Sequence, residues 1–373
     1  MVDTPAITIT GGGIAGQAMA LAFARAGIEV CLIGEQDDQA PGGVQLAPNA
    51  WAALEVLGVG DTARAQAQPL RMMRLMALNT GISLATLPLN DRPQRTPYCS
   101  MARADLGRLL AEAATATGRV RHIKNRSTAI TSHEDGVAIT LADGSLHETG
   151  WLIGCDGAAG ICREYLEADA PGKRHHTRDA YRLIIPEHHR PRGGQATTVW
   201  LGEGGHIVHY PLADGRLNLV AMVRPGTNSA ADARRMLTKQ PLLADWAEAV
   251  AAVEPAPLYD YPLLGAWQRG RVLVAGDAAH PMPPHLAQGA GQGLVDAASM
   301  IRQLAAFDGA DLQPVVTAWS AERMRMIRRV SRDARRAGVM FALDGLGGKI
   351  RNLGLASIGE IGLGLALERL WSA

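Results

Sequence analysis

The pattern of apolar and polar positions opens with a compact alternation of elements. A β-branched run at 6–10 ends at a glycine cluster, apolar residues at helical spacing follow over 17–26, and a second apolar run covers 28–33. This order predicts a strand, a glycine turn, a helix and a second strand parallel to the first. Such a unit is typical of a dinucleotide-binding fold.

The pattern changes from about residue 171 to 264, where β-type runs alternate with Pro- and Gly-rich loops. Several strands with few helices predict a mostly antiparallel sheet inserted into the first domain. After residue 295 the pattern is helical to the end. We therefore predict an α/β protein that has a Rossmann-like nucleotide-binding domain, an inserted, mostly antiparallel β-sheet domain and a helical C-terminus.

These changes of pattern give the expected domain boundaries. The length of 373 residues exceeds what one compact core normally holds. The predicted domains are 1–70 with 98–170 and 265–345 for nucleotide binding, 71–97 with 171–264 for the substrate-binding sheet, and 346–373 for a C-terminal helical segment.

Composition narrows the classes of partner. The 37 basic and 36 acidic residues nearly cancel, which argues against nucleic acid. The four cysteines, Cys31, Cys99, Cys155 and Cys162, have no metal-like spacing, and we expect no metal site. The N-terminus lacks the pattern of a signal peptide, and we find no run of 18 apolar residues, so we expect a cytoplasmic protein without an integral membrane segment.

Two glycine-rich motifs lie about 260 residues apart. The first, at 11–16, follows the first predicted strand, and missing side chains there let backbone N–H groups approach a pyrophosphate. The second runs from Gly276-Asp277 to Gly293. Its carboxylate suits polyol hydroxyls, and its bare amides suit negative charge at a helix start. The pair indicates one long dinucleotide held at both ends, as FAD requires.

The motifs together resemble those of the single-component FAD-dependent aromatic hydroxylases, the family of p-hydroxybenzoate and salicylate hydroxylases. They are the glycines at 11–16, Arg-Ala-Asp-Leu at 103–106, Cys-Asp-Gly at 155–157 with Arg163, and GDAAH to QGAGQG at 276–293. The segment after Gly276-Asp277 is most similar to the branch of hydroxynicotinate and hydroxypyridine-carboxylate monooxygenases. The motifs occur in the family's order and span most of the chain.

This resemblance implies roles for individual residues. The glycines of the first motif would cradle the pyrophosphate, Glu35 would hold the ribose, and Asp277 would bind the ribityl chain. The implied cofactor-binding positions are Gly11, Gly13, Ala15, Gly16, Glu35, Arg103, Asp156, Gly157, Asp277, Gln288, Gly289, Ala290 and Gly291. Two departures from the family pattern are Gly160, where a serine is usual, and Ala287, where a glycine is frequent.

The resemblance also implies a reaction. FAD would be reduced by a transiently bound NAD(P)H, and O₂ would be captured as a flavin C4a-hydroperoxide that hydroxylates a small aromatic or N-heteroaromatic ring. The polar candidates for positioning or deprotonating that ring are His285, Tyr210, His209 and Gln45. His285 is the first choice, because it lies beside the expected flavin face. A homodimer is left open.

Several alternatives stay open. The same fold serves hydroxylases of prenylated quinone precursors, flavin halogenases and reductases, and a flavin-binding redox sensor would need no catalysis. No two tryptophans stand two apart, which counts against a halogenase. The arginines from 323 to 336 are interpreted as a solvated face paired with acids, and the amphipathic tail from 351 to 370 as packed on the core or a second subunit. Attraction to a membrane is the alternative for both segments, and attraction of the phosphate of the nicotinamide cofactor is a further alternative for the arginines.

Overall fold

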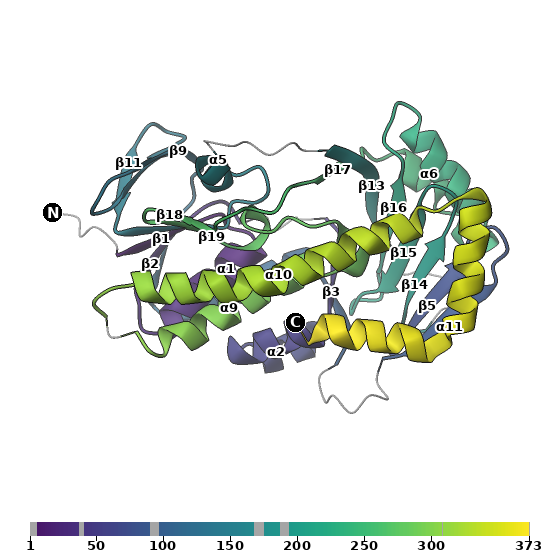
Figure 1. Cartoon of the computed structure of the whole chain (residues 1–373), viewed down its shortest axis with the longest axis horizontal. Coiled ribbons are helices and arrows are strands. Elements are labelled where there is room, and N and C mark those ends of the chain that lie inside the picture. Colours follow the sequence, from purple (N-terminus) through teal and green to yellow (C-terminus); the bar gives the residue numbers. More distant parts are fainter. Residues whose placement is uncertain are drawn as a thin grey trace.

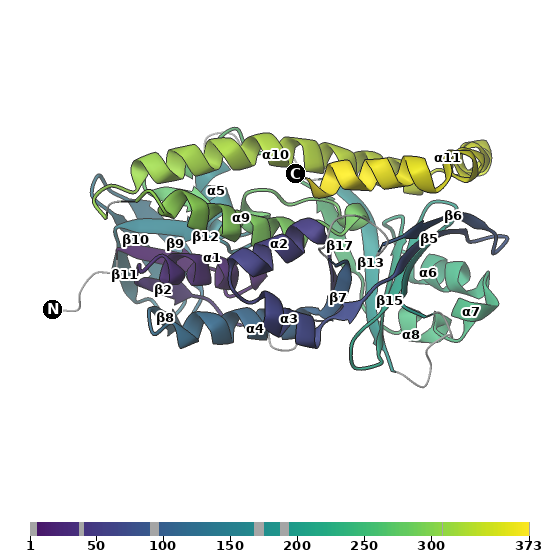
Figure 2. The ribbon, with the colours of Figure 1, turned by 90° about the horizontal axis from the view of Figure 1, so that it is seen from below.

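The computed structural model describes residues 6–36, 41–89, 97–167, 175–186, 194–307 and 309–372. The molecule is elongated, with one large sheet toward each end and a long helix along one side (Figures 1 and 2). This helix is α10 (Gln313–Phe341), and α11 (Gly345–Trp371) follows it.

The first large sheet has six strands in the order β18-β19-β12-β1-β2-β8. Every neighbouring pair is parallel except β18 and β19. All residues of β1, β2 and β12 are buried, as expected for a parallel sheet covered on both faces. The strands are β1 (Ile7–Thr10), β2 (Val30–Ile33), β8 (Val120–Ile123), β12 (Trp151–Gly154), β18 (Gln268–Arg269) and β19 (Val272–Val274).

One face of this sheet is covered by helices and the other by a small antiparallel sheet. Helix α1 follows the glycine turn and contacts α4 and α9. Residues of β10 share a core with the large sheet. The covering elements are α1 (Ile14–Arg25), α4 (Arg103–Ala116), α5 (Ile161–Glu167), α9 (Gly289–Leu304), β9 (Ser127–Ser132), β10 (Val137–Leu141) and β11 (Leu146–Thr149).

The second large sheet has seven strands in the order β17-β13-β16-β15-β14-β5-β6. It is antiparallel except where β14 pairs parallel with β5, so it joins two chain segments that are far apart in sequence. The strands are β5 (Met72–Ala77), β6 (Ser83–Pro88), β13 (His175–Ile185), β14 (Ala196–Leu201), β15 (His206–Pro211), β16 (Leu217–Val223) and β17 (Ala256–Asp260). One face packs on α6 (Ser229–Thr238), α7 (Pro241–Ala244) and α8 (Ala247–Ala251).

A third, small sheet lies between the two large ones (Figure 2). Its order is β3-β7-β4, formed by β3 (Gly43–Leu46), β4 (Gln68–Pro69) and β7 (Cys99–Ala102). Helices α2 (Pro48–Val56) and α3 (Gly60–Gln66) lie beside it. The predicted α/β class, with a Rossmann-like domain, a mostly antiparallel second sheet and a helical C-terminus, is confirmed, while the domain boundaries stay a prediction.

The C-terminal helix α11 packs one side against the seven-stranded sheet. It bends at Gly359, whose φ of 60° and ψ of −160° are not helical, and Figure 1 shows this as a sharp turn in the yellow helix. Leu355 and Leu363 pack against the apolar residues of β5, β6 and β14. Among the described residues, α11 is the one helix long and apolar enough to cross a membrane, by length and composition alone. The expected absence of a membrane segment therefore stays a prediction.

Candidate functional site: a dinucleotide cradle opening into a cavity

The glycine turn after β1 has room for a ligand on one side and none on the other. A Cβ on Gly11 would lie 2.3 Å from the carbonyl oxygen of Cys155, and one on Gly16 would lie 1.8 Å from the carbonyl oxygen of Gly11. A Cβ on Gly13 would meet nothing within 4 Å. The turn is thus packed tightly against β12, while Gly13, the residue before α1, faces open space.

The remaining predicted residues of this end surround the same turn. Glu35 is exposed just beyond β2, and its carbonyl oxygen would lie 2.4 Å from a Cβ on Gly12. Ala15 lies against the second motif, since a Cβ on Gly276 would lie 2.6 Å from the Cβ of Ala15. The two glycine motifs, distant in sequence, therefore meet at α1.

Asp156 stands at the end of β12 beside this turn. Its Oδ2 accepts a hydrogen bond of 3.0 Å from the backbone N–H of Cys162, whereas its buried Oδ1 has no partner among the described residues. Burial raises the pKa of this carboxyl group. A Cβ on Gly160 would lie 2.2 Å from the Asp156 carboxyl carbon, so a serine here would require the Asp156 side chain to move. Gly157 has a φ of 87° and open space beside it.

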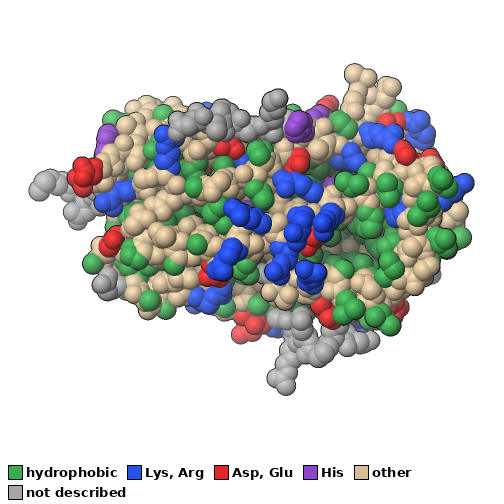
Figure 3. Space-filling view, viewed as in Figure 1, with side chains coloured by type: hydrophobic (Ala, Val, Ile, Leu, Met, Phe, Trp, Pro, Cys, Tyr) green, Lys and Arg blue, Asp and Glu red, His purple; other side chains and the backbone are tan. Residues whose placement is uncertain are grey.

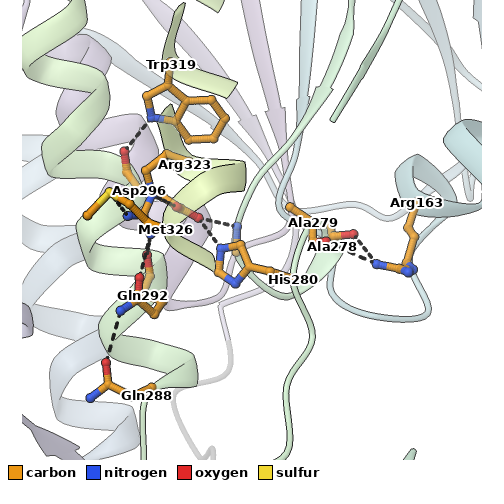
Figure 4. A network of polar contacts seen from close by, with 11 residues as sticks. Arg163, Ala278, Ala279, His280, Gln288, Gln292, Asp296, Trp319, Arg323 and Met326 are labelled. Carbon is orange, nitrogen blue, oxygen red and sulfur yellow. Dashed lines mark hydrogen bonds and ion pairs between the residues drawn. The ribbon is translucent and has the colours of Figure 1, made fainter. Parts of the chain in front are cut away.

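At the second end, a buried carboxylate fixes the loop after β19 (Figure 4). Asp296 Oδ2 lies 2.7 Å from His280 Nε2 and accepts a 2.8 Å hydrogen bond from the backbone N–H of Gly276. Asp296 Oδ1 accepts a 2.7 Å hydrogen bond from Arg323 Nε. Burial raises the pKa of Asp296, but His280, Arg323 and these hydrogen bonds together hold it at about 2.

The same network extends to the start of α9. The Arg323 guanidinium donates to Gln292 Oε1 at 2.7 Å, and Gln288 Oε1 accepts hydrogen bonds from both Gln292 and Asn49. Gln288 is buried and precedes Gly289, the first residue of the helix. A Cβ on Gly291 would lie 3.2 Å from Ala50 Cβ. The network thereby sets where the bare amides of the α9 N-terminus point.

A cavity of about 810 Å³ connects this second end with the seven-stranded sheet. Arg103, Asp277, Gly289 and Ala290 lie at its cradle end. Its other walls come from the inward faces of the sheet, from β3, and from α10 and α11. Sheet residues that line it are Met73, Leu75, Arg182, Thr197, Val199, Val208, Tyr210, Asn218, Val220, Met222, Pro257, Leu258 and Tyr259.

Three of the four predicted substrate residues line the cavity. Tyr210 is fully enclosed, and burial raises the pKa of its hydroxyl above the usual range. Gln45 Oε1 accepts a 3.0 Å hydrogen bond from the Tyr98 hydroxyl. His285 lies in a 3₁₀ turn, η3 (Pro284–Leu286), where burial, assisted by Arg178, lowers its pKa to about 4. His285 is therefore neutral at pH 7.

The fourth, His209, points the other way and does not line the cavity. Adjacent residues of a strand face opposite sides of a sheet, and Tyr210 occupies the cavity side. The His209 ring accepts a 3.1 Å hydrogen bond from Trp200 Nε1 and packs on Trp246, in the core under α6 to α8. The expectation that His209 lies beside the substrate is therefore wrong, because side chains alternate between the two faces of β15 and Tyr210 occupies the cavity side.

Two residues that the motifs did not single out lie on the cavity side. His206 shares the face of Tyr210, with its ring centroid 5.3 Å from that of His285 and its buried Nε2 without a partner among the described residues. Burial lowers its pKa. Arg182 lines the cavity from β13, and burial lowers its pKa too. As the one charge in the apolar run 181–185, Arg182 could have been noticed in the sequence.

The residues present fit FAD. The cradle has open space beside Gly13 and Gly157, an unpartnered oxygen on Asp156, and a helix N-terminus at Gly289 next to Asp277. These are the groups that hold a pyrophosphate, hydroxyls and an electron-rich ring edge. The cavity then continues past this point, which leaves room for a second molecule.

Comparison with known proteins agrees with this geometry. The model of an FAD-binding domain family matches residues 3–334. The chain is 34% identical to 3-amino-4-hydroxybenzoate 2-monooxygenase of Streptomyces platensis, covering 94% of this chain and 92% of that one. It is 32% identical to a 3-hydroxybenzoate 6-hydroxylase of Aquipseudomonas alcaligenes, covering 86% and 85%.

A solved structure shares the fold over nearly the whole chain. HpxO of Klebsiella pneumoniae, crystallised with FAD and uric acid, has a TM-score of 0.83 at 21% identity, covering 98% of this chain and 96% of that one. The sequence resemblance to FAD-dependent aromatic hydroxylases is therefore confirmed, and FAD and NAD(P)H are the cofactors. The chain belongs to the FAD-binding domain family and is a flavoprotein monooxygenase.

Proposed function

We propose that this enzyme hydroxylates a small aromatic or N-heteroaromatic carboxylic acid, with NAD(P)H as reductant. The observation that supports an acidic substrate is Arg182, a guanidinium on the wall of a largely apolar cavity. It forms no ion pair with a described residue, although the charge of Asp277 attracts it. Burying a charge without a close partner is costly, and a substrate carboxylate would reduce that cost. The relatives named for hydroxybenzoates support the same class of substrate.

The chain's own residues would bind and orient the ring. Arg182 would pair with the carboxylate, while Val199, Val208 and Val220 would enclose the ring and exclude water. When bound, FAD supplies the redox chemistry, in which O₂ is the source of the transferred oxygen. We propose for the cradle residues the roles that the sequence resemblance implies: Gly11, Gly13 and Gly16 would hold the FAD pyrophosphate, and Asp277 would bind the ribityl chain.

His285 is proposed to position the hydroxyl group of the substrate. Because burial lowers its pKa to about 4, the His285 ring is neutral at pH 7 and can accept a hydrogen bond from that hydroxyl group. Such a hydrogen bond makes the aromatic ring more electron-rich and thus more reactive toward an electrophilic oxygen. Burial also keeps His206 neutral, and its ring packs against that of His285, with 5.3 Å between the two ring centroids. Tyr210 and Gln45 would contact the ring.

The test is NAD(P)H oxidation by the purified FAD-loaded protein with hydroxybenzoates, aminohydroxybenzoates and hydroxynicotinates, each paired with its analogue lacking the carboxyl group. Hydroxylated product and peroxide are measured together. We expect the acids to stimulate oxidation and to give product with little peroxide. If only neutral or prenylated rings stimulate oxidation, the proposal that the substrate is a carboxylic acid is overturned. If no ring stimulates oxidation, the protein is better explained as a redox sensor.

A further inference from the structure

Helices α10 and α11 form one outer face of the molecule. Figure 2 shows both along the same side, and Figure 1 looks onto that side. Eight of the thirteen exposed large hydrophobic side chains of the described residues belong to this face. They are Val339, Leu343, Leu346, Ile350, Leu353, Ile358, Ile361 and Leu365, and we call them the apolar stripe.

The spacing of the apolar stripe follows the helix period. Leu346, Ile350 and Leu353 are separated by four and three residues, so they share one side of α11 before its bend. Beyond the bend at Gly359, Ile361 and Leu365 are four residues apart and share one side of the second part of α11, whereas Ile358 is exposed just before the bend. Their exposure reaches 80% at Ile361. Clustered exposure of this kind marks an interaction site, whereas single exposed apolar residues do not.

A row of arginines on α10 continues the apolar stripe. Arg325, Arg328 and Arg329 are exposed and have no ion pair among the described residues, and Arg332 and Arg336 share the carboxylate of Asp333. These five arginines are the basic stripe. Figure 3 shows blue side chains over α10 and green ones over α11 on the same face. The arginines of α10 were expected to form a solvated face paired with acids. Arg332, Arg335 and Arg336 do pair with acids, whereas Arg323 is buried against Asp296 and does not belong to a solvated face.

The charge of this face is unbalanced. Across α10, α11 and the connecting residues 342–344, all of which the structure describes, the exposed carboxylates are Glu360 and Asp344, and Asp344 already pairs with Arg224. A hollow of about 360 Å³, lined by Arg332, Arg335, Arg336 and Val339, lies where the basic and apolar stripes meet. This juxtaposition offers guanidinium groups to a phosphate and an apolar side chain to an acyl chain at the same place.

We propose that the α10–α11 face docks on the surface of an anionic phospholipid bilayer. An apolar face alone would suit a second copy of this chain equally well. The arginines favour the bilayer, because phosphate headgroups supply the anions that the face lacks. The inner side of α11, with Gly364, Leu367 and Trp371, is buried in the protein, so the helix lies on the membrane and does not span it.

The docking face lies directly over the cavity. Ala337 and Met340 of α10 and Leu363 and Leu367 of α11 line the cavity from beneath the exposed stripes. A bilayer held against these helices would therefore touch the outer side of the cavity wall.

The test is flotation of the FAD-loaded enzyme with vesicles of phosphatidylcholine, with and without phosphatidylglycerol. We expect binding only to the anionic vesicles, and its loss as salt is added. Ile350→Glu with Ile361→Glu, and separately Arg328→Glu with Arg329→Glu, should each weaken binding at least fivefold. None of these side chains lines the cavity.

Matched variants elsewhere on the surface serve as controls. Leu146→Glu is a comparably exposed apolar site on β11, and Arg119→Glu with Arg126→Glu reverses two exposed charges away from this face. These variants should bind vesicles normally, and all variants should retain FAD. Absence of vesicle binding would overturn the proposal. So would a dimer in light scattering that the apolar-stripe variants dissociate, because a second copy would then cover the face.

Discussion

His280 Nε2 and Asp296 Oδ2 lie 2.7 Å apart, and neither side chain is exposed to solvent. This contact ties the loop after β19 to the middle of α9, and Arg323 joins the same carboxylate from α10. Three elements that surround the expected flavin end of the cradle are thus fixed by one buried anion. The contact positions other groups, because the two side chains point toward one another (Figure 4) and neither lines the cavity.

Replacing that anion should weaken both the fold and the cradle. In Asp296→Asn, Arg323 loses its buried partner, so we expect about 3–5 kcal/mol less stability. Urea unfolding followed by circular dichroism measures the loss, and the flavin absorbance of the purified protein measures retained FAD. Asp245→Asn, at an exposed position, should change stability by less than about 0.5 kcal/mol. Unchanged stability of Asp296→Asn would show that the network is not needed.

Stability should fall in mild acid. Burial lowers the pKa of His209 to about 4, below the unfolded value of about 6.5, so the unfolded chain binds more protons between these values. Stability therefore falls as pH drops through this window, by about 2 kcal/mol for His209 between pH 7 and pH 5. His209→Gln, which keeps an acceptor for Trp200, should show a smaller fall, whereas His133→Gln at an exposed site should not. An equal fall in stability with pH in the unmodified protein and in both variants would contradict the assignment of this effect to His209.

Ala287→Gly should stabilise the protein. Ala287 is the one described residue other than glycine with a positive φ, at 52°, a conformation that costs a side chain about 1–2 kcal/mol. Part of the gain is lost to the greater freedom of glycine in the unfolded chain, leaving roughly 0.5–1 kcal/mol. Ala318→Gly, exposed inside α10, should instead destabilise by about 1 kcal/mol. A loss at both positions would show that Ala287 is not strained.

The two cradle glycines should respond differently to alanine. Gly16→Ala puts a Cβ 1.8 Å from a carbonyl oxygen, so the turn must open and the fold should be lost or severely destabilised. Gly13→Ala meets only open space, so stability should stay nearly unchanged while FAD affinity falls. Flavin fluorescence titration of the apoprotein and thermal unfolding separate the two effects. Unaltered FAD affinity in Gly13→Ala would place the pyrophosphate elsewhere.

Arg182→Gln should discriminate between substrates. Losing a charge-assisted contact with a carboxylate raises the KM for the acid about 10- to 100-fold, with little change for the analogue that lacks the carboxyl group. Arg74→Gln, on the opposite face of the same sheet, is the matched control and should leave both KM values unchanged. An equal rise for acid and analogue would mean that Arg182 shapes the cavity without binding the acid.

The sequence predicted the fold class because its strands, glycine turns and helices carry local signals. It could not place the cavity-lining side chains, since that depends on strand register. Period two alone shows that His209 and Tyr210 cannot both face one cavity, but only the pairing of β15 with its neighbours shows that His206 and Tyr210 share the inner face. The closing of the cavity by Leu367 and Trp371 depends on tertiary packing, which no local pattern encodes.

The parallel pairing of β14 with β5 has a consequence for how this enzyme can diversify. It places Leu75 and Val199 side by side on a sheet that shares no strand with the one carrying the cradle. Substitutions at such positions reshape the chamber while the glycine turn and the Asp296 network stay intact. Substrate specificity can therefore change during evolution while the residues that hold the cofactor stay the same.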